Sequence, residues 1–459
     1  MTKNLDLTTG SISKKLFKLS LPIMGTSFMQ CGYNMVDMFW VGKTGANAVA
    51  AVGTAGFYPW LAVALIIIAR IGGEVRVAQS IGEKNEQKTR MYIKSAIELN
   101  IIHALIYSAI LIIFSDYLIG FFRLHSYEVN QMGSIYLKII GAGMIFTFMN
   151  PVFTAIFNGM GNSSTPFKIN AMCLLINIVL DPILILGIGG FPKLGVTGAA
   201  LATVFAQMVG TIIFMYLAYK QRNTYFKINL YRDIDTRYYK ELYKLGFPPA
   251  IQSAMFTLIS MTLGVIVAIW GPVAIAAQKV GTQIESISYM TADGMASAMS
   301  SFVGQNVGAK EGQRVKKGIR LGLYFAAIWG ILSGLFMIVF GREIFAIFIN
   351  EKTAIAVGSA YLIILGYSQP FNCIEIIASG IFKGLGRTIL PSFVSIFFNA
   401  LRIPAAILLS RSELMGLNGV WWAISISSIV KGIIMFIAVV FRYRNKSLYP
   451  KNSKEEIIC

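Results

Sequence analysis

The sequence carries little charge for its size. Asp, Glu, Lys and Arg make up 13% of its 459 residues, about half of the roughly 25% that is usual in soluble domains. Hydrophobic residues make up 56%, and the mean hydropathy is +0.65. A chain of this composition cannot cover a water-facing surface with polar groups, so a series of soluble domains is excluded. The composition indicates a polytopic membrane protein.

Cysteine and histidine are also scarce. The four cysteines lie far apart and form no CxxC pair, and the two histidines have no partner at ligand spacing. The sequence therefore predicts neither a disulfide framework nor a zinc site. Gly42-Lys43-Thr44 resembles the end of a phosphate-binding loop, but Asp37 stands where that loop needs its first glycine. A prenyl or glycosyl transferase would need closely spaced loop aspartates, which are missing, so we expect neither an enzyme nor a cofactor.

Apolar stretches near the ~20 residues that cross a bilayer recur along the chain. Because lipid cannot satisfy free backbone groups, each stretch is expected to be a helix. The twelve predicted transmembrane helices lie at about 15–42, 46–80, 92–115, 133–157, 166–188, 196–219, 243–270, 273–304, 319–341, 356–382, 389–410 and 417–441.

Acidic residues are fewer than basic ones, 21 against 40. In a soluble protein this excess would suggest nucleic-acid binding, whereas in membrane proteins Lys and Arg gather on cytoplasmic loops. With the N-terminus inside, 28 Lys and Arg fall on cytoplasmic segments and 6 on outer ones. We therefore expect no nucleic-acid partner and a multi-pass protein of a bacterial or archaeal cytoplasmic membrane, with both termini in the cytoplasm.

An internal repeat divides the twelve segments into halves. KKLFKLSLP (14–22) returns as KELYKLGFP (240–248), and AQSIG (78–82) returns as GQNVG (304–308), both with an offset of 226 residues. Both halves begin on the same side of the membrane, so the sequence predicts an all-α protein with two six-helix bundles related as parallel repeats. Transporters often bind their substrate between such repeats. The predicted parts are an N-terminal lobe (1–218), a basic cytoplasmic linker (219–242) and a C-terminal lobe (243–459).

Two carboxylates stand inside predicted membrane helices of the first half, and each shares a helical face with two amide side chains. Both carboxylates lack an acidic counterpart in the second half, where Leu263 and Ile403 take their places. Intramembrane acids are costly and point to function. Oxygen-rich faces of this kind suit Na⁺ or a proton, although each acid could instead bond a neighbouring helix. The two faces are Gln30, Asn34 and Asp37, and Asn170, Asn177 and Asp181.

The second half has charged residues of its own within predicted helices. They form either a second acidic site for a cationic substrate or internal pairs such as Glu375 with Arg402 and Lys279 with Glu285. The residues are Lys279, Glu285, Asp293, Glu375 and Arg402.

Three further basic residues lie within the predicted helices. Arg70 and Glu74 are four residues apart and are expected to pair with each other. Lys431 and Arg76 are expected to extend toward the cytoplasmic face.

Seven motifs in order resemble the multidrug and toxic compound extrusion (MATE) family over nearly the whole chain, with Asp37 and NIVLDP most similar to its prokaryotic DinF-like branch. The motifs are LSLP (19–22), YNMVDMFWVG (33–42), VAQSIGEKN (77–85), NGMGNSSTP (158–166), NIVLDPILI (177–185), GVTGAALATV (195–204) and GLGRTILP (384–391).

The resemblance implies a V-shaped transporter that exports amphipathic, often cationic drugs by antiport with Na⁺ or H⁺. It implies a cation site made of Asp37, Asn177, Asp181 and Thr203, with Tyr136 beside it. Asp37 and Asp181 would be the Na⁺ ligands if the protein is sodium-coupled. The resemblance also implies that Gln30, Asn34 and Asn150 line the substrate chamber. From the residues themselves we add the polar and charged side chains of the other predicted helices as candidate chamber residues, which are Asn170, Gln252, Lys279, Asp293 and Glu375. We expect a monomer in the lipid bilayer.

The second half departs from the family pattern. Other branches carry an acid in the seventh helix, where this chain has only Gln252, and their acid in the tenth helix falls on Asn372, one turn before Glu375. Asp293 stands where the family usually has an apolar residue. Cation coupling is therefore expected in the first half. The alternative within the same superfamily is a lipid-linked oligosaccharide flippase, which would need more cationic residues along its cavity.

Overall fold

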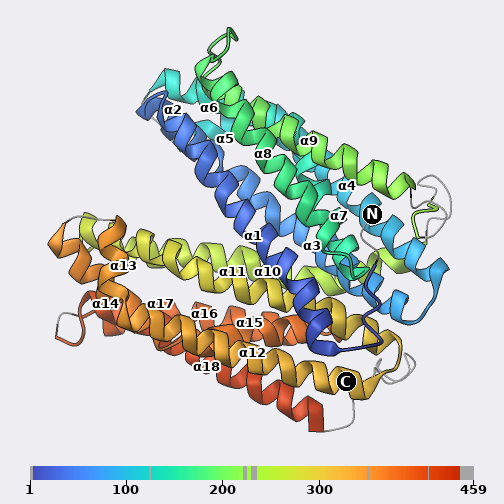
Figure 1. Ribbon diagram of the computed structural model, residues 1–459. Helices are drawn as coiled ribbons and strands as arrows, with labels where there is room; N and C mark the ends of the chain where they lie inside the picture. The colour runs from blue at the N-terminus through green and yellow to red at the C-terminus, as the bar shows by residue number, and fades with distance from the viewer. Residues whose placement is uncertain are drawn as a thin grey trace. The chain divides into compact units, whose positions relative to one another are not determined.

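The described part of the chain is built from α-helices. The computed structural model describes residues 4–122, 126–220, 225–228, 235–348, 351–411 and 413–444. Figure 1 labels the helices from α1 to α18. Their bounds are α1 Ile12–Gly42, α2 Ala46–Ala55, α3 Phe57–Gly82, α4 Glu86–Ile113, α5 Ser115–Gly120, α6 Tyr127–Ala142, α7 Met144–Gly159, α8 Ser164–Leu186, α9 Val196–Lys220, α10 Thr236–Ala268, α11 Pro272–Gly308, α12 Gly312–Val339, α13 Gly341–Phe348, α14 Lys352–Gly366, α15 Gln369–Gly384, α16 Ile389–Ala400, α17 Arg402–Leu409 and α18 Leu417–Arg444.

Most of these helices are long and apolar enough to cross a membrane. Within the described ranges, eight segments meet this description, or ten if two bent helix pairs each count as one span. The bent pairs are α6 with α7, at 49°, and α14 with α15, at 53°. The first bend falls at Gly143, where a Cβ atom would lie 2.4 Å from the Val204 side chain of α9. A residue without a side chain therefore lets the broken helix approach its neighbour.

Two predicted membrane helices, α1 and α11, are more polar than these segments and are not among them. They have 31 and 37 residues, which correspond to about 46 and 55 Å of helix, longer than the ~30 Å hydrocarbon core. Hydropathy therefore supports ten of the twelve predicted spans. The polar residues that lower the hydropathy of α1 and α11 include the candidate site residues Asp37 and Asp293.

The described helices gather into two compact units. Among the described residues, unit 1 contains residues 4–5 and 25–250, and unit 2 contains residues 6–24 and 251–444. The division falls inside α1 and inside α10, at positions 226 residues apart, which is the offset of the sequence repeat. Each unit therefore contains the first turns of a helix whose remainder belongs to the other unit.

In unit 1, the start of α10 packs closely against α3. A Cβ atom on Gly246 would lie 2.1 Å from the carbonyl oxygen of Ile68, and one on Gly72 would lie 2.7 Å from that of Leu242. Glycine at both positions lets the two helix backbones touch. The same unit has α8 and α9 side by side, shown in green in Figure 1.

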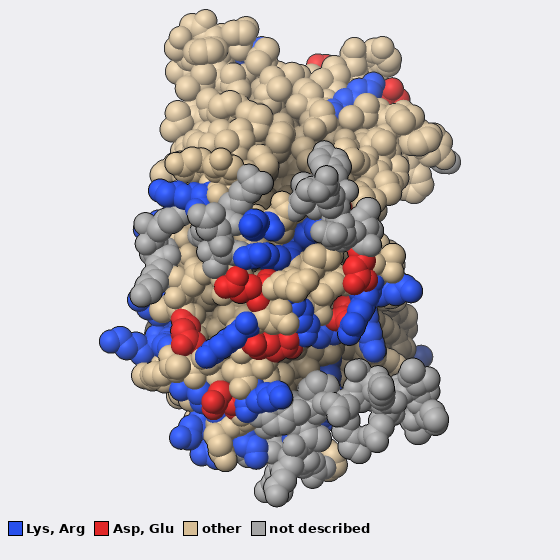
Figure 2. Space-filling model, turned by 90° about the vertical axis from the view of Figure 1, so that its right-hand side faces the viewer, with Lys and Arg blue, Asp and Glu red and all other residues tan. Residues whose placement is uncertain are grey.

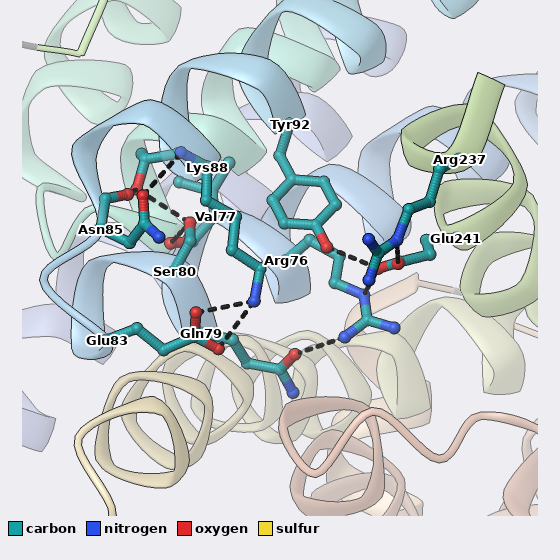
Figure 3. A network of polar contacts seen from close by, with 11 residues as sticks. Arg76, Val77, Gln79, Ser80, Glu83, Asn85, Lys88, Tyr92, Arg237 and Glu241 are labelled. Atoms are coloured by element: carbon teal, nitrogen blue, oxygen red, sulfur yellow. Dashed lines mark hydrogen bonds and ion pairs between the residues drawn. The ribbon is translucent and has the colours of Figure 1, made fainter. Parts of the chain in front are cut away.

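Polar contacts hold the same part of α10 (Figure 3). The carboxylate of Glu241 lies 3.3 Å from the Arg76 guanidinium of α3 and 3.4 Å from Arg237 one turn earlier. The Tyr92 hydroxyl of α4 donates to the same carboxylate. A second guanidinium nitrogen of Arg76 donates to the side-chain oxygen of Gln79. In the structure Arg76 joins α10 to α3, and its extension toward the cytoplasmic face stays a prediction.

In unit 2, the segment before α1 is held at the start of α12. Arg314 donates hydrogen bonds to the carbonyl oxygens of Leu7, Thr9 and Gly10 at 2.8–3.1 Å. Asn306 at the end of α11 also donates to the carbonyl of Leu7. Helices α1 and α12 therefore begin at the same end of the unit.

Candidate cation site

Helix α8 carries a buried amide–carboxylate pair. The Asn177 side chain donates a hydrogen bond of 2.9 Å to Oδ1 of Asp181 one turn later, and both residues are fully buried. Pro182 follows inside the helix, and since proline has no amide hydrogen, the carbonyl of Ile178 lacks its usual helical donor. The local sequence thus concentrates oxygen atoms at this level of α8.

Helix α1 brings a second carboxylate to the same place. Asp37 and Asp181 are close enough to interact electrostatically, and the Tyr136 hydroxyl of α6 interacts with both. Tyr33, one turn before Asp37, donates to the backbone carbonyl of Thr203 on α9 at 3.4 Å. The structure therefore brings together, from α1, α6, α8 and α9, the five residues predicted for ion coupling.

Four side-chain oxygens of this cluster are buried and have no hydrogen-bond partner in the described part of the chain. They are Asp37 Oδ1, Asn177 Oδ1, Asp181 Oδ2 and Thr203 Oγ1. Leaving a buried polar atom unpaired costs roughly 1–3 kcal/mol, and more when it is charged. Carboxylate, amide and hydroxyl oxygens are the ligands of hard cations. A proton shared between the two carboxylates would pair the carboxylate oxygens alone. The donor set fits Na⁺ or H⁺.

The remaining chamber residues predicted in the first half are arranged differently. The Asn150 amide of α7 donates to Gln207 at 2.6 Å and accepts from Thr211 at 2.8 Å, both on α9. Asn170 donates to the Pro166 carbonyl of its own helix. Asn150 therefore joins α7 to α9, and the Asn170 side chain is bonded to the backbone of the first turn of α8.

Two chamber residues predicted on α1 remain. Gln30 is exposed on the surface of unit 1. The side chain of Asn34 lies outside the described residues, so its predicted role stays a prediction.

In unit 2, three buried charges and the half-buried Glu285 lie near one another on four helices. Glu375 of α15 pairs with Lys431 of α18 at 3.4 Å. Glu285 of α11 accepts hydrogen bonds from Gln369 at 3.1 Å and from Tyr361 at 3.4 Å. Arg402 of α17 donates to two serine hydroxyls of α18, Ser427 and Ser428, at 2.6 and 2.9 Å.

These contacts correct three sequence-based expectations. Glu375 takes Lys431 as its partner and not Arg402, although Arg402 remains within electrostatic reach of both carboxylates. Lys279 is exposed and does not reach Glu285. Lys431 is 4% exposed and does not extend toward a membrane face. Which residues of facing helices meet depends on how each helix is rotated about its axis, and the spacing along one helix does not determine that rotation.

The other second-half residues predicted for the chamber lie apart from these contacts. Gln252 on α10 and Asp293 on α11 are half-buried. Their roles stay predictions.

Sequence reasoning missed Tyr33, Gln207 and Thr211. Tyr33 lies four residues before Asp37, on the same face of α1, so helical spacing alone could have found it. Gln207 and Thr211 are four residues apart on α9 and contact α7, and only the packing of the two helices shows it.

The fold and the buried ionisable groups define the class of the protein. Several membrane-spanning helices with carboxylates inside them are typical of the ion and substrate pathways of membrane transporters. The family model described as MatE matches residues 22–183 and 248–408, which is more than half of the chain. The chain belongs to the MATE family, which is a family of transporters and not of enzymes.

Its relatives match over nearly the full length. The probable multidrug resistance protein NorM of Thermotoga maritima is 29% identical over 450 residues, which are 97% of this chain and 93% of that protein. The probable multidrug resistance protein YoeA of Bacillus subtilis is 27% identical over 447 residues, or 95% and 96% of the two chains. A crystal structure of MATE in the straight conformation has a TM-score of 0.88 at 24% identity, covering 96% of this chain and 98% of that one. The structural likeness shows that the fold is shared.

Proposed function

We propose that this chain is a secondary active exporter that exchanges Na⁺ or H⁺ for amphipathic, often cationic compounds. Membership of the MATE family and relatives named as probable multidrug resistance proteins support the substrate class. The observation that carries the coupling is the cluster of unpaired oxygens around Asp37 and Asp181. A bound cation or a proton shared by the two carboxylates would supply the partner that these oxygens lack among the described residues.

The cluster supplies a physical link between the ion and the conformation. Two nearby carboxylates repel each other when both are ionised, and a bound cation removes that repulsion. Because α1, α6, α8 and α9 each contribute a residue, neutralisation changes the preferred packing of these helices. A ligand shifts a conformational equilibrium only through unequal affinity for the two states, so the site must bind the cation more tightly in the state that releases the drug.

The branch, orientation and assembly belong to the same proposal. Asp37 together with NIVLDP at 177–182 supports the DinF-like branch. The bias of Lys and Arg supports cytoplasmic termini in a bacterial or archaeal inner membrane, and Figure 2 shows a face on which Lys and Arg gather. We expect the chain to act as a monomer with two six-helix lobes, 1–218 and 243–459.

The test is ethidium efflux from proteoliposomes under a Na⁺ gradient or a pH gradient, imposed separately. We expect one gradient to drive efflux and Asp37→Asn to abolish it, since the amide cannot exchange a proton and binds Na⁺ weakly. Asp116→Asn is the matched control, because this exposed carboxylate lies in the short helix α5, outside the cluster. Full efflux by Asp37→Asn would place coupling elsewhere. Absence of efflux from folded wild-type protein under both gradients would contradict the exporter proposal.

A further inference from the structure

An apolar cavity of about 420 Å³ lies in unit 2, between the first turns of α1 and helices α11 and α12. Most of its wall comes from one face of α12. The indole nitrogen of Trp329 donates to the Ser288 carbonyl at 3.3 Å, so its polar atom is engaged with α11. The lining residues include Leu16, Phe17, Met295, Tyr324, Ile328 and Trp329.

Two contacts border the cavity. The rings of Phe17 and Phe325 meet edge to face, with centroids 6.0 Å apart, and join α1 to α12. Gly322 lets α12 pack closely on α11, since a Cβ atom there would lie 3.0 Å from the Met299 side chain. Several lining side chains also face outward, since Phe17 is 51% and Ile328 60% exposed. The cavity is therefore an apolar recess in the surface of unit 2.

Lysines stand on the same helical faces as the lining residues, at the end where both helices begin. Lys14 precedes Phe17 by three residues, and Lys317 precedes Leu321 by four, so each lies within one turn of the cavity on its face. Lys18 lies one turn after Lys14 on α1, to the side of the face that carries Phe17. All three lysines are exposed. The contacts of Arg314 with the segment before α1 place these helix starts side by side.

We propose that this recess binds an anionic phospholipid, with an acyl chain in the cavity and the phosphate at Lys14, Lys18 and Lys317. Basic pockets between membrane helices recognise anionic headgroups, and an apolar recess facing hydrocarbon suits a flexible chain. A cationic drug is disfavoured by the same lysines. One turn of a helix about 10 Å across already occupies about 420 Å³, so the recess is too small for a partner helix. The inference does not depend on the transport proposal.

The headgroup part of the proposal is tested by lipid binding to the purified full-length protein in detergent micelles. Titration with spin-labelled phosphatidylglycerol and phosphatidylcholine measures affinity and immobilisation of the acyl chain. We expect tighter binding of phosphatidylglycerol and a loss of about fivefold for each of the three lysines changed to Gln. Lys168→Gln is the matched control, since Lys168 is an exposed lysine near the start of α8 in unit 1. Equal affinity for the two lipids would overturn the proposal.

The cavity part is tested by filling it. Ile328→Trp adds bulk inside the recess, whereas Ile331→Trp adds it to an exposed position of α12 that does not line the recess. We expect Ile328→Trp to weaken phosphatidylglycerol binding at least tenfold, because the larger side chain occupies the space of the acyl chain. We expect Ile331→Trp to change the affinity by less than about twofold, because position 331 lies outside the recess. Unchanged binding in Ile328→Trp, or displacement of the lipid by ethidium, would overturn the proposal. Thermal unfolding of each variant checks that it is folded.

Discussion

The acidic side chains inside the two units differ in how completely they are hydrogen-bonded. Around Asp37 and Asp181, four oxygens are left without a hydrogen-bond partner among the described residues. In unit 2, Glu285 and Glu375 both accept from neighbouring side chains. An unpaired buried oxygen costs free energy unless a ligand joins it, whereas a paired charge is satisfied by the protein itself. Ion binding is therefore expected in unit 1, and a structural role for the charges of unit 2.

Glu375→Gln is expected to destabilise the protein because it leaves Lys431 buried without its partner. Removing one member of a buried ion pair costs about 3–5 kcal/mol, which lowers the midpoint of thermal unfolding. The measurement is the unfolding of purified protein in detergent. The double variant Glu375→Gln with Lys431→Met is expected to recover most of the loss, because both charges are then removed.

A matched control separates this effect from the loss of any carboxylate. Glu343→Gln removes an exposed acid of α13 in the same unit, and exposed charges contribute about 0–1 kcal/mol. Equal unfolding midpoints for Glu375→Gln and Glu343→Gln would show that the ion pair of Glu375 does not stabilise the fold. Unimpaired ion-driven efflux by the double variant would further support the structural role.

At the scale of the helix, close backbone contacts depend on particular glycines. The start of α10 lies against α3 at Gly246, whereas a Cβ atom on Gly264 of the same helix would meet nothing within 4 Å. The two glycines therefore face different surroundings on one element. Small residues let helix backbones approach closely. An added methyl group at Gly246 would therefore clash with the backbone of α3, whereas one at Gly264 has free space.

Gly246→Ala is expected to push α10 away from Ile68 and to lower stability by about 1–3 kcal/mol, the usual cost of overpacking. Gly264→Ala is expected to be neutral or to raise stability by up to about 1 kcal/mol, because alanine favours the helix. Thermal unfolding of the two variants side by side gives the comparison. A stable Gly246→Ala protein would mean that α10 can shift without cost.

At the scale of the whole molecule, the repeat and the compact units do not coincide. The repeat begins with α1 and again with α10, yet both helices change unit in their course, after Met24 and after Ala250. Arg314 holds the segment that leads into α1, and Glu241 holds the early turns of α10. The two halves thus secure the start of their first helix with different residues, at positions that the repeat does not relate.

The orientation of the whole chain is tested by cysteine labelling in intact cells. In a variant without the four native cysteines, we expect Lys193→Cys, between α8 and α9, to react with an impermeant maleimide. Lys227→Cys, between α9 and α10, is expected to react only after the cells are opened, because positive loops stay in the cytoplasm. The opposite pattern would invert the proposed topology.

Much of the candidate site could be predicted from the sequence. Asp37 and Asp181 stand out as lone acids in apolar helices, and helical spacing placed Asn177 on the face of Asp181, where the structure has their hydrogen bond. The partner of Glu375 could not be predicted in this way. Lys431 lies on another helix, and spacing along one helix says nothing about the rotation of the next.

The sequence by itself determined the class of the protein, most of its membrane helices and the acids that bear on ion coupling. Polar groups are costly in lipid, so membrane helices have a recognisable composition and the few acids within them are easily identified. Only the tertiary structure decided which charges meet, which oxygens stay unpaired, and at which residues α1 and α10 pass from one compact unit to the other. These features depend on helix rotation and on contacts between residues far apart in the chain. Local propensity and hydropathy contain no information on either.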